Sequence, residues 1–357
     1  MDRRTFLTTG LLGAAVVAAR PGRAVADPPA FAGLSGPVRQ EIAKLVDAAR
    51  SEGKVVIYAP ASLGENFGRG FRAYFGLPDS FAVEEAIYKT ADLQGRVETE
   101  LRAGKLAGDF IRFPIGPWVF GLKAKGLLLE WQNPEEKAYA TIHAEPAYWV
   151  PTMWAPVIIW NPQKVQDTLD SWRDLANPKY SGRVAIGDAS KSAGWTQYFY
   201  VLSTRLSEKY FEDLSRVKPG FIVSSETLVE AAVSGEYPIV VSTSFSAYRV
   251  VAQKKVDLRV AYPKDGIVPV VDAFFTFKSS PHPAAGRLAR MFHASREGQQ
   301  QLMREGGYLS FRPDIESPNE KLLPPITKLN VIPFDYRKVS QKELDQFRKR
   351  FITVFNL

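Results

Sequence analysis

The sequence contains no cysteine, and this absence excludes several kinds of site. Without a thiol the chain forms no disulfide, builds no thiolate metal site and has neither a cysteine nucleophile nor a lipid-modified cysteine. Histidine is almost as scarce, since His143, His282 and His293 are the only three and none is spaced like a zinc-binding pair. We therefore expect no metal centre, no cofactor and no histidine-based catalytic triad.

Dense blocks of charge and long apolar runs are also missing. The net charge is +8, and Lys and Arg are spread along the chain instead of forming a basic arm, so no nucleic-acid partner is expected. The hydrophobic share of 45% and the charged share of 24% are typical of a soluble globular protein. A length of 357 residues is sufficient for two domains, each with its own core.

The N-terminus has the pattern of an export signal. Arg3 and Arg4 precede an apolar run over residues 6–19, which is followed by the small-residue sequence Ala24-Val25-Ala26. The apolar run is too short to span a bilayer comfortably. The paired arginines resemble the twin-arginine type, which exports folded cargo. We expect residues 1–26 to be removed and the mature protein to be periplasmic.

The remaining chain alternates between short apolar strands and helices of about ten residues. Strands are expected at 54–59, 81–87 and 109–113 in the first half, and near 183, 221, 238 and 258 in the second. This alternation predicts an α/β protein with largely parallel sheets. The extended aromatic stretch 148–161 is interpreted as a crossing into a second domain, and 268–277 as the return.

In open α/β sheets, ligands bind beyond the carboxyl ends of the strands, and a cleft between two such domains is the default site. The loops expected there are 60–66, 112–118, 188–195 and 242–248. The most informative is 187–196, where a strand turns through Ser, Lys and Gly into a helix. The free N–H groups of a helix start attract anions, Lys191 adds a positive charge and Trp195 offers a flat wall. The alternative is an ordinary helix capped by Ser190 or Ser192.

Several segments, in this order, resemble one family. They are Gly53 to Tyr58, Glu100 to Asp109, Val157 to Asn161, Ser171 to Arg183, Ser234 to Ile239, Pro281 to Ala285 and Ser295 to Gln299. The chain resembles the periplasmic solute-binding proteins of ABC importers, in the ferric-iron-like branch of the type II binding proteins. The resemblance implies an α/β fold of two lobes, with two doubly wound mixed sheets joined by two crossing strands. Lobe 1 would comprise residues 27–155 and 268–357, and lobe 2 residues 156–267.

The ferric members of that family, as the resemblance implies, hold iron with two adjacent tyrosines and place an anion on a Ser-Gly-Ala turn. Here Phe245-Ser246 occupies the place of the tyrosine pair, and no histidine occurs in 59–67. Ferric ion prefers phenolate, carboxylate and imidazole donors, which Phe and Ser do not supply. Ser192-Ala193-Gly194, in contrast, matches the anion turn.

These observations favour an organic solute with a carboxylate or phosphate, its anionic end on the Ser192 turn and its body against Trp195 and Phe245. Arg112 is a candidate for bidentate contact with the anion, or else pairs with Glu98 or another acid. Trp118 and Trp154 are candidates for packing or for the rim of the cleft. The residues expected to bind the solute are Ser62, Arg112, Trp154, Lys191, Ser192, Ala193, Gly194, Trp195, Ser242, Thr243, Ser244, Phe245 and Asp272.

The expected function is therefore that of a monomeric binding protein, without catalysis, which delivers its solute to an inner-membrane ABC permease and its ATPase. Three alternatives remain: a protein that binds ferric iron or a ferric chelate, a solute-loaded partner of a membrane sensor kinase, and a periplasmic hydrolase. Asp109, Glu84 and Glu85 supply carboxylates, but nothing in the sequence places two of them on facing loops, as hydrolysis requires.

Overall fold

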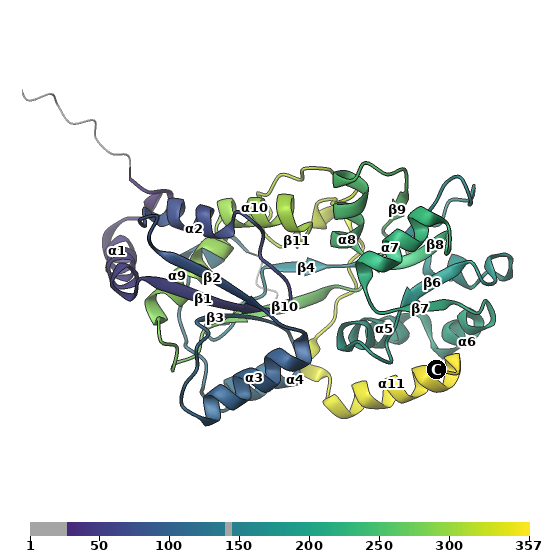
Figure 1. Ribbon diagram of the computed structural model, residues 1–357, viewed down its shortest axis with the longest axis horizontal. Helices are drawn as coiled ribbons and strands as arrows, with labels where there is room; N and C mark the ends of the chain where they lie inside the picture. The colour runs from purple at the N-terminus through teal and green to yellow at the C-terminus, as the bar shows by residue number, and fades with distance from the viewer. Residues whose placement is uncertain (1–26, 140–144) are drawn as a thin grey trace, which may run out of the picture.

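The structure is a computed structural model that describes residues 27–139 and 145–357. The expected signal segment 1–26 and His143 lie outside the described residues. Two mixed β-sheets, each covered by helices, lie side by side along the long axis of the molecule (Figure 1). The fold is therefore the α/β arrangement of two lobes that the sequence predicts.

The first lobe is built on a six-stranded sheet of order β11-β4-β10-β3-β1-β2. Its strands are β1 (Lys54–Ala59), β2 (Ala82–Ile87), β3 (Phe110–Pro114), β4 (Thr152–Trp154), β10 (Val270–Phe275) and β11 (Leu309–Ser310). Its helices are α1 (Gly36–Glu52), α2 (Phe67–Phe75), α3 (Thr90–Arg102), α4 (Pro117–Ala124), α9 (Pro283–Ala294) and α10 (Arg296–Gly306).

The second lobe has a five-stranded sheet of order β7-β6-β8-β5-β9. Its strands are β5 (Pro156–Trp160), β6 (Val184–Gly187), β7 (Gly220–Ile222), β8 (Ile239–Thr243) and β9 (Arg259–Ala261). Its helices are α5 (Ala193–Leu206), α6 (Glu208–Arg216), α7 (Ser225–Ser234) and α8 (Ser244–Tyr248). Short helices occur at Pro29–Phe31, Pro134–Ala138, Trp172–Ala176, Pro178–Tyr180, Arg249–Gln253, Ile326–Lys328 and Tyr336–Lys338, and the last long helix is α11 (Gln341–Phe355).

Local sequence explains the first element of the first lobe well. In α1, Ile42, Leu45, Val46 and Ala49 recur at helical spacing and are all buried, and the helix packs on α9 and β1. The helix ends at Gly53, which has φ of 76° and donates its N–H to the carbonyl of Ala49. Because this left-handed conformation strains other residues, glycine suits the position before β1 begins.

The sheets are mixed and less parallel than the alternation of elements suggests. β1 runs parallel to β2 and β3, but β10 is antiparallel to β3 and β4, and β5 is antiparallel to β8 and β9. β4, β5 and β10 belong to the segments that carry the chain between the sheets, and of these β5 and β10 run opposite to the strands of the βαβ units. This register sets Phe274 of β10 opposite Arg112 of β3.

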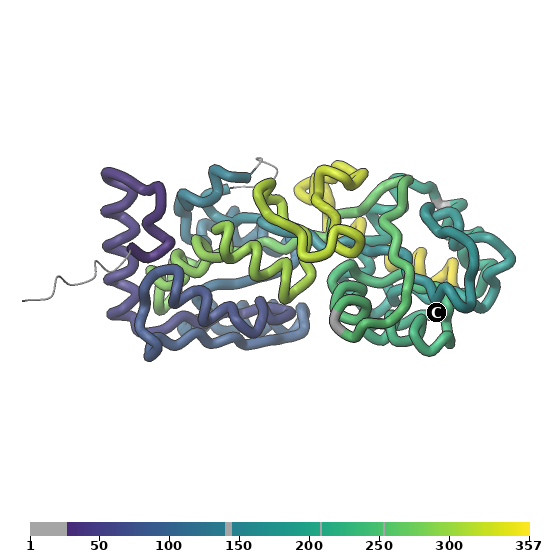
Figure 2. The backbone as a smooth tube through the Cα atoms, turned by 90° about the horizontal axis from the view of Figure 1, so that it is seen from above, coloured from purple at the N-terminus to yellow at the C-terminus, as the bar shows by residue number. Residues whose placement is uncertain are grey.

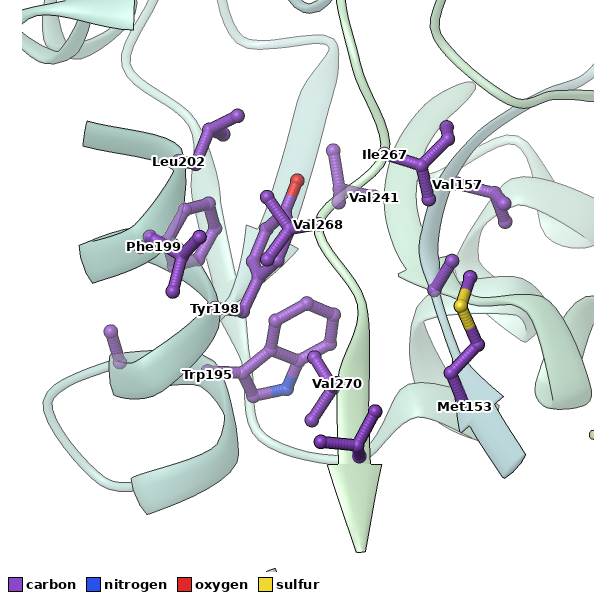
Figure 3. Close-up of a cluster of buried hydrophobic side chains, with 14 of the residues drawn as sticks. Met153, Val157, Trp195, Tyr198, Phe199, Leu202, Val241, Ile267, Val268 and Val270 are labelled. Carbon is purple, nitrogen blue, oxygen red and sulfur yellow. The ribbon is translucent and has the colours of Figure 1, made fainter. Parts of the chain in front are cut away.

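The chain passes between the sheets at two places that adjoin in space. β4 ends at Trp154 in the first sheet and β5 begins at Pro156 in the second, whereas β9 of the second sheet is followed by β10 of the first. One continuous apolar core joins them, and it includes Met153, Val157, Val268 and Val270 around the crossing (Figure 3). The division into lobes at residues 155 and 268 stays a prediction.

The C-terminal helix lies on the second lobe, although the predicted division assigned residues 268–357 to the first. α11 packs on α5 and α6 of the second lobe, with the ring centroids of Phe351 and Phe199 5.5 Å apart and those of Phe347 and Phe211 6.0 Å apart. The stripe of Phe347 and Phe351 is visible in the sequence, but the surface that it covers is not. Figure 2 shows the yellow-green segment before α11 passing from one lobe to the other.

This segment forms a third connection between the lobes. Ile267, just before the returning strand β10, donates its N–H to the carbonyl of Asn330 at 2.7 Å, and Ile332 donates its N–H to the carbonyl of Ile267 at 2.8 Å. The hydroxyl of Tyr262 also donates to the carbonyl of Leu322 at 2.8 Å.

Within the described residues, none of the helices combines the length and apolarity needed to cross a bilayer.

A buried histidine in the first lobe gives a test of stability against pH. The ring of His293 is 1% exposed and lies 4.2 Å from that of Phe274, and neither ring nitrogen has a hydrogen-bond partner among the described residues. Burial first, and the positive charge of Arg112 second, hold the pKa of His293 well below its usual value. The unfolded chain therefore takes up a proton below about pH 6.5 that the folded chain does not.

We expect the free energy of unfolding to fall by up to about 1.4 kcal/mol for each pH unit below 6.5 on account of His293 alone. Urea unfolding at pH 7.5 and 5.5 measures this loss, and His293→Leu should remove that part of it. Carboxylates and the other histidines contribute equally to the pH dependence of unfolding in the wild type and in the variant. An equal loss in the variant and in the wild type would contradict the assignment.

Candidate functional site

The turn between β6 and α5 is held by its own side chains. Ser192 is the N-cap of α5, and its hydroxyl accepts a hydrogen bond from the N–H of Trp195 at 3.4 Å. Thr196 donates its hydroxyl to the carbonyl of Ala189 at 2.7 Å, which fixes the turn to the first helical turn. Among the described residues, no protein acceptor is found for the N–H groups of Ala193 and Gly194. These two amides are the unused donors of the turn.

The same turn carries one charge of each sign. The carboxylate of Asp188 is buried and accepts from the N–H of Ser190 at 2.9 Å, so it organises the turn. Lys191 places its Nζ 3.2 Å from Asp188 Oδ2, while its side chain remains 72% exposed. The sequence pattern suggests a purely positive site, but Asp188 offsets part of the charge of Lys191. The ammonium group remains accessible to solvent, on a residue two positions before Ala193.

Trp195 lies in the core in this structure, not on the surface of a cleft as the sequence suggests. It is 3% exposed, and its indole lies directly on the backbone of Gly187, where a Cβ atom would be only 1.9 Å from the ring. Figure 3 shows Trp195 beside Val270 and below Tyr198, among buried side chains. Its Nε1 donates to the carbonyl of Val223 at 3.3 Å. Trp195 therefore joins α5 to the end of β7.

A row of aromatic rings connects the two lobes next to this turn. Trp154 contacts Trp195 at 6.2 Å and Phe245 at 6.0 Å between ring centroids, both edge to face. Phe245 in turn stacks on Tyr308 at 5.5 Å. Trp154 and Phe245 are half-buried, whereas Tyr308 is buried. A Cβ atom on Gly194 would lie 3.9 Å from the Trp154 ring, so Trp154 lies beside the unused amides.

Arg112 and Asp272 pair with each other. Arg112 Nε lies 2.7 Å and Nη2 2.6 Å from Asp272 Oδ2, and both side chains are buried. Arg112 also lies 4.5 Å from the centre of the Tyr308 ring. Burial lowers the pKa of Arg112, but Tyr308 and Asp272 outweigh it and hold this pKa above its usual value. The expected alternative partner, Glu98, instead accepts from Trp118 Nε1 at 2.9 Å.

The expected hydroxyl groups all make hydrogen bonds within the protein. Ser242 donates to the carbonyl of Ser225 at 2.7 Å, Thr243 donates to Ser246 Oγ at 2.9 Å, and Ser244 Oγ accepts from the N–H of Ala155 at 3.2 Å. All three residues are buried. Ser62 is exposed and accepts from the N–H of Gly64 at 3.0 Å. These hydroxyls stabilise loops and the N-terminus of α8.

Two contacts between the lobes were not expected from the sequence. Gln197 of α5 donates to the carbonyl of Ile115 at 3.0 Å, and Tyr248 of α8 donates to the carbonyl of Arg304 at 3.2 Å. Tyr308 was also missed, although an aromatic residue after the Gly306-Gly307 pair is a weak signal of a close approach. Gly307, with φ of 73°, leaves room for Phe245, whose Cα would lie 3.0 Å from a Cβ atom there.

Phe245 and Ser246, which the family resemblance predicts at the place of a tyrosine pair, both make contacts within the protein. Ser246 donates its hydroxyl to Glu226 Oε1 at 3.1 Å, and Arg249 lies 5.3 Å from the centre of the Phe245 ring. In residues 27–139 and 145–357, no cluster of three or more His, Asp or Glu side chains is arranged to hold a metal ion.

The comparison with known families decides the assignment. Residues 113–338 match the family described as bacterial extracellular solute-binding proteins. The chain belongs to this family. A search of curated protein sequences finds no relative of this solute-binding protein.

Solved structures with the same fold include an iron-bound protein, a periplasmic binding protein and a substrate-binding protein of an ABC transporter. Iron-bound HitA from Pseudomonas aeruginosa is 19% identical with a TM-score of 0.64, and the match covers 85% of this chain and 98% of HitA. AfuA from Actinobacillus pleuropneumoniae, with fructose-6-phosphate bound, is 17% identical with a TM-score of 0.69, and the match covers 85% of this chain and 99% of AfuA. A substrate-binding protein of an ABC transporter from Agrobacterium tumefaciens is 16% identical with a TM-score of 0.72, and the match covers 85% of this chain and 94% of that protein.

Proposed function

We propose that this solute-binding protein is the periplasmic component of an ABC importer that captures a small organic anion between its lobes. The solute carries a carboxylate or a phosphate, and the protein delivers it to an inner-membrane permease and its ATPase without catalysing a reaction. The observation that carries the proposal is the turn before α5. It presents the unused N–H groups of Ala193 and Gly194, two and three residues after the exposed Lys191, beyond the carboxyl end of β6.

The turn before α5 offers three donors within the four residues 191–194. The first amides of a helix carry partial positive charge and point outward, so they bind an anion without side-chain rearrangement. Lys191 adds a full charge on a flexible side chain. The fructose-6-phosphate bound to AfuA, which shares the fold, supports a phosphate or a related group as the anion. Trp154 beside Gly194 supplies an apolar contact for the rest of the solute.

A thermal-shift screen of the refolded mature chain tests the function. The panel contains phosphates, carboxylates and ferric complexes, and refolding removes any solute retained from the cell. A solute that binds only the folded state stabilises it by about 2.7 kcal/mol at a hundredfold excess over its Kd. We expect at least one organic anion to raise the midpoint without being converted. A response to ferric complexes alone would favour the iron alternative, and turnover of the solute would favour an enzyme.

Lys191 should contribute directly to affinity. Lys191→Gln should weaken binding of the best anion by about tenfold, because one charged contact of a ligand is commonly worth about 1.5 kcal/mol. Lys209→Gln is the matched control, since Lys209 is 73% exposed and pairs with Asp213 on the outer helix α6. Titration calorimetry on both variants measures the difference. Equal affinity in the two variants would remove Lys191 from the site.

A further inference from the structure

The first lobe has a hollow between α3 and α4. Its volume is about 770 Å³, and it is formed by the C-terminal part of α3, by α4 and by the loops that follow these two helices. Figure 1 shows α3 and α4 on the lower face of the first lobe. Among the described residues that line the hollow, none belongs to the turn before α5. A hollow of this size accommodates a small organic ligand.

The walls of this hollow are mainly apolar. Trp118 is half-buried, its ring centroid lies 4.3 Å from that of Phe113, and its Nε1 donates to Glu98, so the indole is fixed in position. Leu127 is 36% exposed and is one of only five large hydrophobic residues with high exposure in the described part of the chain. A hydrocarbon group that covered this surface would remove it from water. The larger apolar residues of the lining are Leu101, Leu106, Trp118, Leu122 and Leu127.

The lining also carries more positive than negative charge. Arg102 and Lys125 belong to it, and Glu98 is the only acid among the described lining residues. Glu98 already accepts from Trp118 Nε1 at 2.9 Å and from Gln94 Nε2 at 3.0 Å, and it lies 4.0 Å from Arg102. Lys125 is exposed and has no acidic partner among the described residues. The one carboxylate of the hollow therefore leaves Lys125 without a counter-charge.

Two further lysines adjoin the lining. Lys105 directly follows the lining residue Gly104, and Lys278 places its Nζ 4.0 Å from where a Cβ atom on Gly126 would lie. Both lysines are exposed, and neither has an acidic partner among the described residues. Together with Lys125 they surround an apolar hollow with positive charge that the protein does not neutralise. Charge complementarity therefore favours a ligand with a negative group and an apolar body.

We propose that this hollow binds a single-chain anionic amphiphile from solution, such as a long-chain carboxylate. The hydrocarbon chain lies between α3 and α4 against Trp118 and Leu127, and the carboxylate lies among the lysines. One chain fits better than a bilayer surface, because the apolar side chains line a concave space between two helices. The proposal is independent of the proposed function, since the two sites share no described residue.

Titration calorimetry of the mature chain with octanoate, decanoate and dodecanoate, each below its critical micelle concentration, tests the proposal. The affinity should rise by about threefold for each added methylene, because each one is transferred out of water. Dodecyltrimethylammonium has the same chain and the opposite charge, and it should bind at least about tenfold more weakly than dodecanoate. An affinity that does not change with chain length, or a preference for the cation, would overturn the proposal.

Two variants locate the bound chain. Leu127→Asn and Lys125→Gln should each weaken dodecanoate by about three- to tenfold, and both positions are exposed, so the fold should tolerate them. Val233→Asn on α7, where Val233 is 40% exposed, and Lys44→Gln on the exposed face of α1 are the matched controls and should change nothing. Equal affinity in the test variants and the controls would place dodecanoate elsewhere and contradict the proposal.

Quenching of tryptophan fluorescence by a brominated dodecanoate gives a second readout. Trp118→Phe should lose the saturable part of this quenching, while its calorimetric affinity stays within about threefold of the wild type. Lys191→Gln should change neither readout, and a loss there would assign the amphiphile to the turn before α5 instead. Binding to phosphatidylglycerol vesicles without any response to monomeric dodecanoate would identify a membrane-binding surface, and the proposal would then be wrong.

Discussion

Arg112→Met should lower the free energy of unfolding by about 3–5 kcal/mol, because it leaves the buried carboxylate of Asp272 without its partner. The side chains of Arg112 and Asp272 are 5% and 7% exposed, and the two charges share a site closed by the Tyr308 ring. Urea unfolding at pH 7.5 measures the loss. Lys209→Met is the control, since its exposed pair with Asp213 should contribute less than about 1 kcal/mol.

A double variant separates two explanations for that loss. Arg112→Met with Asp272→Leu removes both charges, and an apolar pair of similar volume commonly restores most of the stability. Recovery would show that the single variant suffers from an unpaired charge. If Arg112→Met instead kept its stability and lost affinity for anions, Arg112 would be a solute ligand, as the sequence pattern suggests.

Trp195→Ala should also destabilise the protein by about 3–5 kcal/mol, which is typical of removing a buried aromatic side chain. The ring lies on Gly187 and among the side chains that join α5 to the crossing strand, so its loss leaves a cavity at the junction of the lobes. Trp154→Ala is the comparison, because Trp154 is only half-buried and should lose less stability. Near-normal stability of Trp195→Ala, together with lost solute binding, would indicate that Trp195 lines the cleft and contacts the solute.

The elements of the fold follow closely from sequence patterns, because strand and helix periodicities are local. The expected strands at 54–59 and 81–87 correspond to β1 and β2, and the helix expected from Ser192 begins with Ser192 as its cap. The partner of α11 was not predictable in this way. An amphipathic helix shows that it needs an apolar surface, but α5 and α6 offer that surface only after the second lobe has folded.

The site was harder to predict, because its key contacts depend on strand register. Arg112 stands out as a charge in an apolar strand, but Asp272 lies 160 residues away and meets it only through the pairing of β3 with β10. Trp195 has the spacing of an exposed first-turn residue, but the absence of a side chain at Gly187 lets the indole turn inward.

Amide hydrogen exchange with and without solute tests the central claim most directly. The refolded chain is saturated with the tightest-binding organic anion of the screen, and the exchange of the α5 turn is compared with that of α6. We expect strong protection at Ala193 and Gly194, whose N–H groups have no protein acceptor among the described residues, with little change in α6. Binding of the anion with unchanged exchange at Ala193 and Gly194 would contradict it.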